Sequence, residues 1–71
     1  MAKVIKSEMA GTILEIKVKA GDKVQAGQEV AVVESMKMEV PLQASEAGTV
    51  KTIKKNVGEF LNEGETLIEL G

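Results

Sequence analysis

The chain has 71 residues, a formal net charge of −2, one aromatic residue (Phe60), and neither Cys nor His. This composition excludes disulfides, Cys-based zinc sites and histidine catalysis, and it lacks the basic, aromatic surface that binding nucleic acids requires. No apolar run approaches the roughly 20 residues that cross a bilayer, and the N-terminus has no signal-peptide core, so we expect one small cytoplasmic domain.

The first half of the chain predicts short β-strands. Lys3 to Lys6, Thr12 to Val18 and Glu29 to Val33 are rich in aliphatic and β-branched residues, and turn-like residues 19–23 and 25–28 separate the last two. No segment of 11 or more residues keeps a helical apolar pattern without a glycine interrupting it. We expect four short strands in this half and almost no helix in the chain.

The second half repeats the first at an offset of 37 residues. Residues 10–13 (AGTI) match residues 47–50 (AGTV), and six of the seven glycines form three pairs at this offset: Gly11 with Gly48, Gly21 with Gly58, and Gly27 with Gly64. Matched glycines indicate matched turns. Further strands are therefore expected at 40–43, 49–54 and 66–70. The repeat predicts a single domain over 1–71, built by duplication of 3–34 as 40–71.

The spacing of apolar residues predicts irregular strands. Ile13 and Ile16, like Val50 and Ile53, have opposite parity, so both members of a pair face inward only if a bulge or bend follows Ile13 and Val50. Pro41 lacks a backbone N–H, which fits an edge or the start of a strand. We predict an all-β fold: a flattened barrel or sandwich of two four-stranded antiparallel sheets with quasi-twofold symmetry. The predicted inward-facing residues are Ile5, Ile16, Val24, Ala31, Val33, Leu42, Ile53, Leu61, Ile68 and Leu70.

The junction of the two halves falls within the hexapeptide ESMKME, Glu34 to Glu39. We expect Lys37 at the exposed tip of the hairpin that joins them. A free lysine is only about 0.04% deprotonated at pH 7, and Glu34 and Glu39 nearby favour the charged form further. Lys37 is therefore better suited to modification by another enzyme than to catalysis. Most exposed lysines merely aid solubility, but Met36 and Met38, a residue type that usually fills cores, favour modification here.

The hexapeptide resembles the (E)(A/S)MKM(E/M) signature of the biotinyl/lipoyl carrier domain family, in its biotinyl branch. Each half also carries the family's AGT(I/V) and G(D/E)xVxxG pattern, with Leu61 at the valine position of the second half. The resemblance covers essentially the whole chain. It implies biotin attached to Lys37, with Met36 and Met38 as flanking recognition residues. Glu34, Ser35 and Glu39 would form the rest of the hairpin.

The resemblance also implies how such a domain works. A biotin protein ligase makes biotinyl-AMP, and the amine of Lys37 attacks it to form an amide. A biotin carboxylase then carboxylates the biotin, and the arm carries carboxybiotin to a carboxyltransferase. The domain itself is then not an enzyme but a component of a biotin-dependent carboxylase or decarboxylase, with no catalytic residue and no metal. The carboxyl acceptor is chosen by a partner protein.

Two alternatives remain open at the level of sequence. The domain could be a lipoyl carrier, or accept both groups, with a lipoate ligase as partner; the lipoyl branch sets its lysine in Asp-Lys-Ala. It could instead be an unmodified lipoyl-like structural domain, although these typically lack the lysine. The equal spacing of Gly11–Gly21 and Gly48–Gly58 predicts no inserted thumb loop. Both a free-standing protein and a domain of a larger subunit fit this length.

Overall fold

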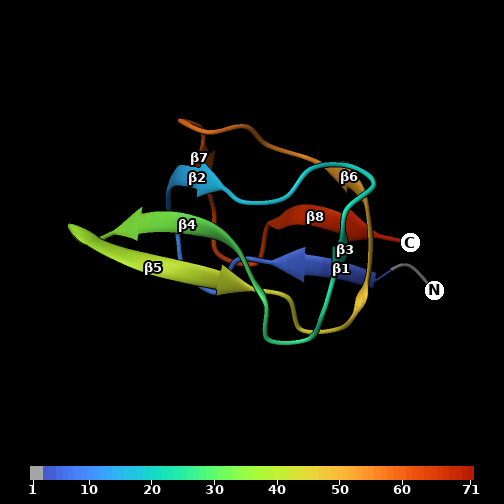
Figure 1. Cartoon of the computed structure of the whole chain (residues 1–71). Helices are drawn as coiled ribbons and strands as arrows, with labels where there is room; N and C mark the ends of the chain where they lie inside the picture. The colour runs from blue at the N-terminus through green and yellow to red at the C-terminus, as the bar shows by residue number, and fades with distance from the viewer. Residues whose placement is uncertain (1–2) are drawn as a thin grey trace.

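The computed structural model describes residues 3–71, and every regular element in that range is a β-strand (Figure 1). The strands form two four-stranded antiparallel sheets, ordered β1-β8-β6-β3 and β5-β4-β2-β7. Within residues 3–71 no helix is long and apolar enough to span a membrane. The strand bounds are β1 Lys3–Lys6, β2 Gly11–Ile16, β3 Lys23–Val24, β4 Glu29–Ser35, β5 Met38–Gln43, β6 Gly48–Ile53, β7 Phe60–Leu61 and β8 Thr66–Leu70.

A shift of 37 residues along the chain maps the strands of each sheet onto those of the other. Shifting each strand by one half converts the order β1-β8-β6-β3 into β5-β4-β2-β7, so each sheet contains two strands from each half. The backbone hydrogen bonds follow the same rule. The N–H of Gly21 donates to the carbonyl of Val50 at 2.8 Å, and the N–H of Gly58 donates to the carbonyl of Ile13 at the same distance. The predicted all-β fold of two quasi-twofold related sheets is confirmed.

The irregular strands occur where parity predicted them. The register of β2 against β4 shifts between Ile13 and Glu15, and that of β6 against β8 shifts between Val50 and Thr52. Pro41 lies in β5, an edge strand, as expected. The connections β2–β3 (17–22) and β6–β7 (54–59) are equally long, so neither half carries an inserted loop.

Paired glycines hold the tight turns. Gly21, Gly27, Gly58 and Gly64 all have positive φ, between 81° and 97°. Each precedes a residue whose N–H donates back three residues, such as Asp22 to the carbonyl of Lys19, which fits a type II turn with glycine at its third position. The third glycine pair, Gly11 and Gly48, does not have positive φ and begins strands β2 and β6.

The core lies between the two sheets and is entirely aliphatic. Eight of the ten predicted inward-facing residues are buried there. The other two, Ile16 and Ile53, are only half-buried against the core, because they end their strands beyond the bulges. Ile13 and Val50, whose inward orientation the bulge argument assumed, are buried as well. So are Val18, Val30, Ala44 and Leu67, which the prediction did not name.

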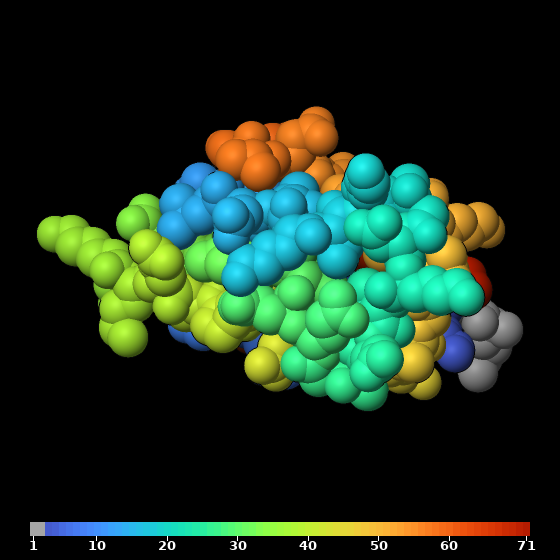
Figure 2. Space-filling model, in the orientation of Figure 1, coloured from blue at the N-terminus to red at the C-terminus, as the bar shows by residue number. Residues whose placement is uncertain are grey.

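The predicted strand ends differ near the central hairpin. β4 continues to Ser35 instead of ending at Val33, and β5 begins at Met38 instead of Val40. β2 ends at Ile16, two residues before the predicted Val18. The longer β4 and β5 project from one end of the molecule, which measures 32 × 18 × 18 Å (Figures 1 and 2).

Candidate functional site

The β4–β5 hairpin carries the ESMKME segment at its tip. Glu34 pairs with Glu39 and Ser35 with Met38, so only Met36 and Lys37 remain as the turn. A two-residue hairpin loop is the tightest connection between antiparallel strands. The sequence expectation that Lys37 lies on this hairpin agrees with the structure. The turn geometry was not foreseen.

Both turn residues have a left-handed backbone. Met36 has φ 55° and Lys37 has φ 62°, and they are the only non-glycine residues with positive φ among residues 3–71. Positive φ at both central positions defines a type I′ turn, which strongly prefers Asn-Gly. A side-chain-bearing residue in this region costs roughly 1–2 kcal/mol. Met-Lys is therefore a poor choice for the turn itself, and strained residues of this kind cluster at functional sites.

The side chains of the tip stand in solvent. Met36 is 87% exposed and Met38 is 66% exposed. Lys37 is also exposed, and among residues 3–71 no hydrogen bond or ion pair joins it to another side chain. Neither Glu34 nor Glu39 forms an ion pair with Lys37; the two glutamates are directly opposite each other in the register of β4 and β5. The amine of Lys37 is free to react with a group that another protein presents.

One hollow of the fold lies near the β4–β5 hairpin but does not reach its tip. A hollow of about 280 Å³ lies between β1 and β5, and it is lined by residues 5–9 of one segment and 40–45 of the other, together with Val33. None of residues 34–39 contributes to it.

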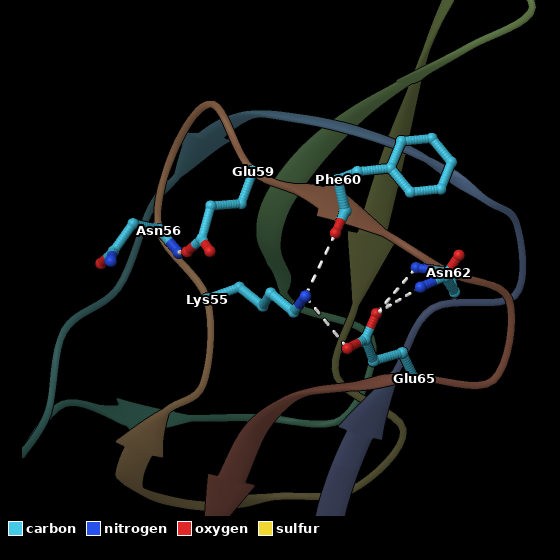
Figure 3. A network of polar contacts seen from close by, with 6 residues as sticks. All are labelled: Lys55, Asn56, Glu59, Phe60, Asn62 and Glu65. Carbon is cyan, nitrogen blue, oxygen red and sulfur yellow. Dashed lines mark hydrogen bonds and ion pairs between the residues drawn. The ribbon is translucent and has the colours of Figure 1, made fainter.

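The charged contacts of the domain lie away from the tip. Lys17 pairs with Glu29 at 3.0 Å, and this hydrogen bond raises the pKa of Lys17. Lys55 pairs with Glu65 at 3.1 Å (Figure 3). The backbone N–H of Asn62, followed by the ammonium of Lys55, lowers the pKa of Glu65. Neither pair involves residues 34–39.

The sequence pattern of one protein family, described as "Biotin-requiring enzyme", matches residues 1–70. The chain belongs to the biotin/lipoyl attachment family. The names of the family and of its members point to two groups, biotin and lipoyl.

Named relatives agree with this assignment. The "Biotin/lipoyl attachment protein" of Bacillus subtilis (strain 168) is 54% identical over 63 residues, which span 89% of this chain and 86% of that protein. The mitochondrial propionyl-CoA carboxylase alpha chain of Homo sapiens is 42% identical over 67 residues, covering 94% of this chain but only 9% of the carboxylase. Among solved structures, the urea carboxylase of Kluyveromyces lactis superposes on the whole chain with a TM-score of 0.91 and 28% identity, over 6% of its own length. Relatives therefore occur both at this size and as one domain of much longer carboxylases.

Proposed function

We propose that this domain carries biotin on Lys37 for a biotin-dependent carboxylase or decarboxylase. The observation that supports the attachment site best is the Met-Lys turn, whose left-handed backbone disfavours both of its residues. Nothing in the folding of a hairpin requires a lysine there. A requirement from outside the fold explains why the strained residue is one with a primary amine.

The chemistry asked of Lys37 is a single nucleophilic step. Its Nζ attacks the carbonyl carbon of biotinyl-AMP, an amide bond forms, the bond to the phosphate oxygen breaks, AMP leaves, and the amine loses its proton. The ligase must supply the base, since no described side chain contacts Lys37. The exposed tip suits this division of labour because it can enter another protein's active site.

Met36 and Met38 are proposed as the residues that the ligase reads beside the lysine. Their side chains are mostly in solvent, so the core does not explain them. Ser35 and the paired glutamates Glu34 and Glu39 hold the strands that present the turn. The second candidate group is lipoyl, because the family and its B. subtilis member include both groups. The Met-Lys-Met setting favours biotin over lipoyl.

The domain contributes tethering and no catalysis of its own. When bound, biotin supplies a site that takes up and releases a carboxyl group. A covalent arm on a projecting hairpin keeps its cargo at an effective concentration of order millimolar for the sites it visits. The proposed partners are a biotin protein ligase, a biotin carboxylase and a carboxyltransferase, the last two as subunits or domains. The interchange of the sheets by the 37-residue offset supports a single domain that arose by duplication. Met1 and Ala2 of the proposed 1–71 range lie outside the described residues.

A modification assay tests the proposal. The chain is incubated with biotin, ATP and a biotin protein ligase and then weighed by mass spectrometry, with a parallel reaction containing lipoate and a lipoate ligase. We expect one biotin on the wild type and none on Lys37→Arg, because a guanidinium keeps the charge but not the nucleophilic amine. One biotin on Lys37→Arg would mean that another lysine is the site. Equal rates of lipoyl and biotin attachment to the wild type would mean that the methionines do not select biotin.

A further inference from the structure

An apolar patch lies on the outer face of the sheet that carries Lys37. It consists of Leu14, Val57 and Phe60, which are 38%, 57% and 53% exposed. Phe60 in β7 pairs with Thr12 in β2, and residues 57–60 run alongside β2 through hydrogen bonds to Ile13. In Figure 2 the orange segment around residue 60 rests against the light-blue segment of β2. These three residues are called the apolar patch below.

The fold does not require the apolar patch. The 37-residue offset maps Leu14, Val57 and Phe60 onto Lys51, Ala20 and Lys23, and all three of these are exposed on the other sheet. Both outer faces thus have the same backbone arrangement, but one is apolar and the other is basic. The buried neighbours, by contrast, are apolar in both halves: Leu61 is 0% exposed and its counterpart Val24 is 3% exposed. Folding therefore does not explain the apolar patch, and we look for a function that involves only this face.

The segment that displays Phe60 is held by an ion pair that its counterpart lacks. Lys55 Nζ donates to the carbonyl oxygen of Phe60 at 3.4 Å and pairs with Glu65 at 3.1 Å (Figure 3). The same glutamate accepts hydrogen bonds from the backbone and side-chain amides of Asn62, at 2.9 Å and 3.2 Å.

In the first half Val18 and Gln28 occupy the positions of Lys55 and Glu65, so this ion pair has no equivalent there. Figure 3 shows the phenyl ring pointing away from the polar network. A fixed aromatic ring loses little conformational freedom when a partner covers it.

The apolar patch and Lys37 are close enough for one protein partner to cover both. Phe60, Thr12, Glu34 and Glu39 form a row of directly paired residues across the four strands, and Lys37 is in the turn that joins the last two. Adjacent strands are about 4.8 Å apart, so the row is roughly 14 Å long. A standard interface covers about 800 Å² on each partner. A protein that takes the Lys37 tip into its active site can therefore cover Phe60 as well.

We propose that the apolar patch is a docking anchor for the ligase that acylates Lys37, an inference that rests on the proposed function. The partner surface that fits has an apolar recess for Phe60 and basic residues facing the carboxylates of Glu34 and Glu39, which share its row. Exposed aromatic residues are the commonest anchors of such interfaces. Attachment to Lys37 itself needs only the hairpin, so the anchor governs how tightly the domain is bound and not the chemical step.

Steady-state kinetics of biotin attachment test this anchor. Phe60→Lys installs the residue found at the equivalent position of the first half, and Lys23→Ala is the matched control on the opposite face. We expect Phe60→Lys to raise the KM for the domain about tenfold with kcat within twofold of wild type. Leu14→Lys should raise KM by a smaller factor, and Lys23→Ala should change neither constant more than twofold. Thermal melting of each variant shows whether the fold is intact.

The outcomes separate the two proposals. If the wild type takes no biotin on Lys37, the proposed function is wrong. If the wild type is modified but neither Phe60→Lys nor Leu14→Lys raises KM beyond twofold, the docking anchor is wrong. If sedimentation shows a wild-type dimer that Phe60→Lys dissociates while KM is unchanged, the apolar patch binds a second copy of this chain and the inference is overturned.

Discussion

Replacing the turn residues Met36 and Lys37 by Asn and Gly should make the domain more stable. Both residues have positive φ, 55° and 62°, and neither packs in the core. Removing a side chain from a left-handed position stabilises the fold by roughly 1–2 kcal/mol. Glycine offsets about 0.5–1 kcal/mol of this gain, because it increases the entropy of the unfolded chain. The double variant Met36→Asn/Lys37→Gly should therefore gain about 1–2 kcal/mol, since Asn-Gly is the preferred type I′ pair.

Thermal unfolding by circular dichroism measures this gain. For a domain of this size each kcal/mol moves Tm by about 4–8 °C, so an increase of about 4–16 °C is expected. Lys23→Gly, at an exposed strand position without positive φ, is the control and should lower Tm, because glycine in a strand costs about 0.5–1 kcal/mol. The double variant should also take no biotin. A Tm at or below that of the wild type would refute the argument that Met36 and Lys37 destabilise the turn and are present for another reason.

Three further changes test how the fold is held. Gly11→Ala should lower the free energy of unfolding by about 2–3 kcal/mol, because a Cβ there would overlap the carbonyl of Glu34. Gly48→Ala should cost less than about 1 kcal/mol, because the nearest neighbour of its Cβ is a side-chain atom at 3.2 Å. Equal losses for the two variants in urea unfolding would contradict this. Gly21→Val should cost about 1–3 kcal/mol from its φ of 97° alone, since no atom lies within 4 Å of the new Cβ, and an unchanged Tm would show an ordinary turn. Glu65→Gln should destabilise the domain at neutral pH but progressively less as the pH falls below the usual glutamate pKa, because a lowered folded-state pKa gives stability that acid removes; a difference from wild type that is the same at pH 7 and pH 3 would be inconsistent with the charge of Glu65 acting.

The sequence predicted those parts of the fold that depend on local pattern. The parity of Ile13 and Ile16 required a bulge, and the register of β2 shifts at that point. The bounds of β1 and β8 match the predicted ones, since each is a short run rich in aliphatic residues. Ile16 faces the core as predicted but is only half-buried, because parity says which face a residue takes and not how far the opposite sheet extends over it.

The features that were missed depend on long-range geometry. No residue type in Met36-Lys37 favours positive φ, so the sequence contained no signal for a type I′ turn; only the pairing of Ser35 with Met38 imposes it. The pair between Lys55 and Glu65 joins two loops, so no periodicity reveals it. A comparison of the halves residue by residue could have found it, because the first half has no charged residue at either position.

The internal repeat separates what the fold needs from what a partner needs. Two copies of one backbone must solve the same packing problem, and they do so with the same residue types: paired glycines at the turns and paired aliphatic residues such as Val24 and Leu61 in the core. Where the copies differ in residue type at exposed positions, packing supplies no reason. Phe60 in place of a lysine is one such difference, and the Met-Lys turn between the copies has no counterpart in either half. Both features lie on the β5-β4-β2-β7 sheet, and both are exposed. A demand from the fold alone would fall on both sheets equally, so their shared position points to one protein that contacts this sheet and the lysine at its end.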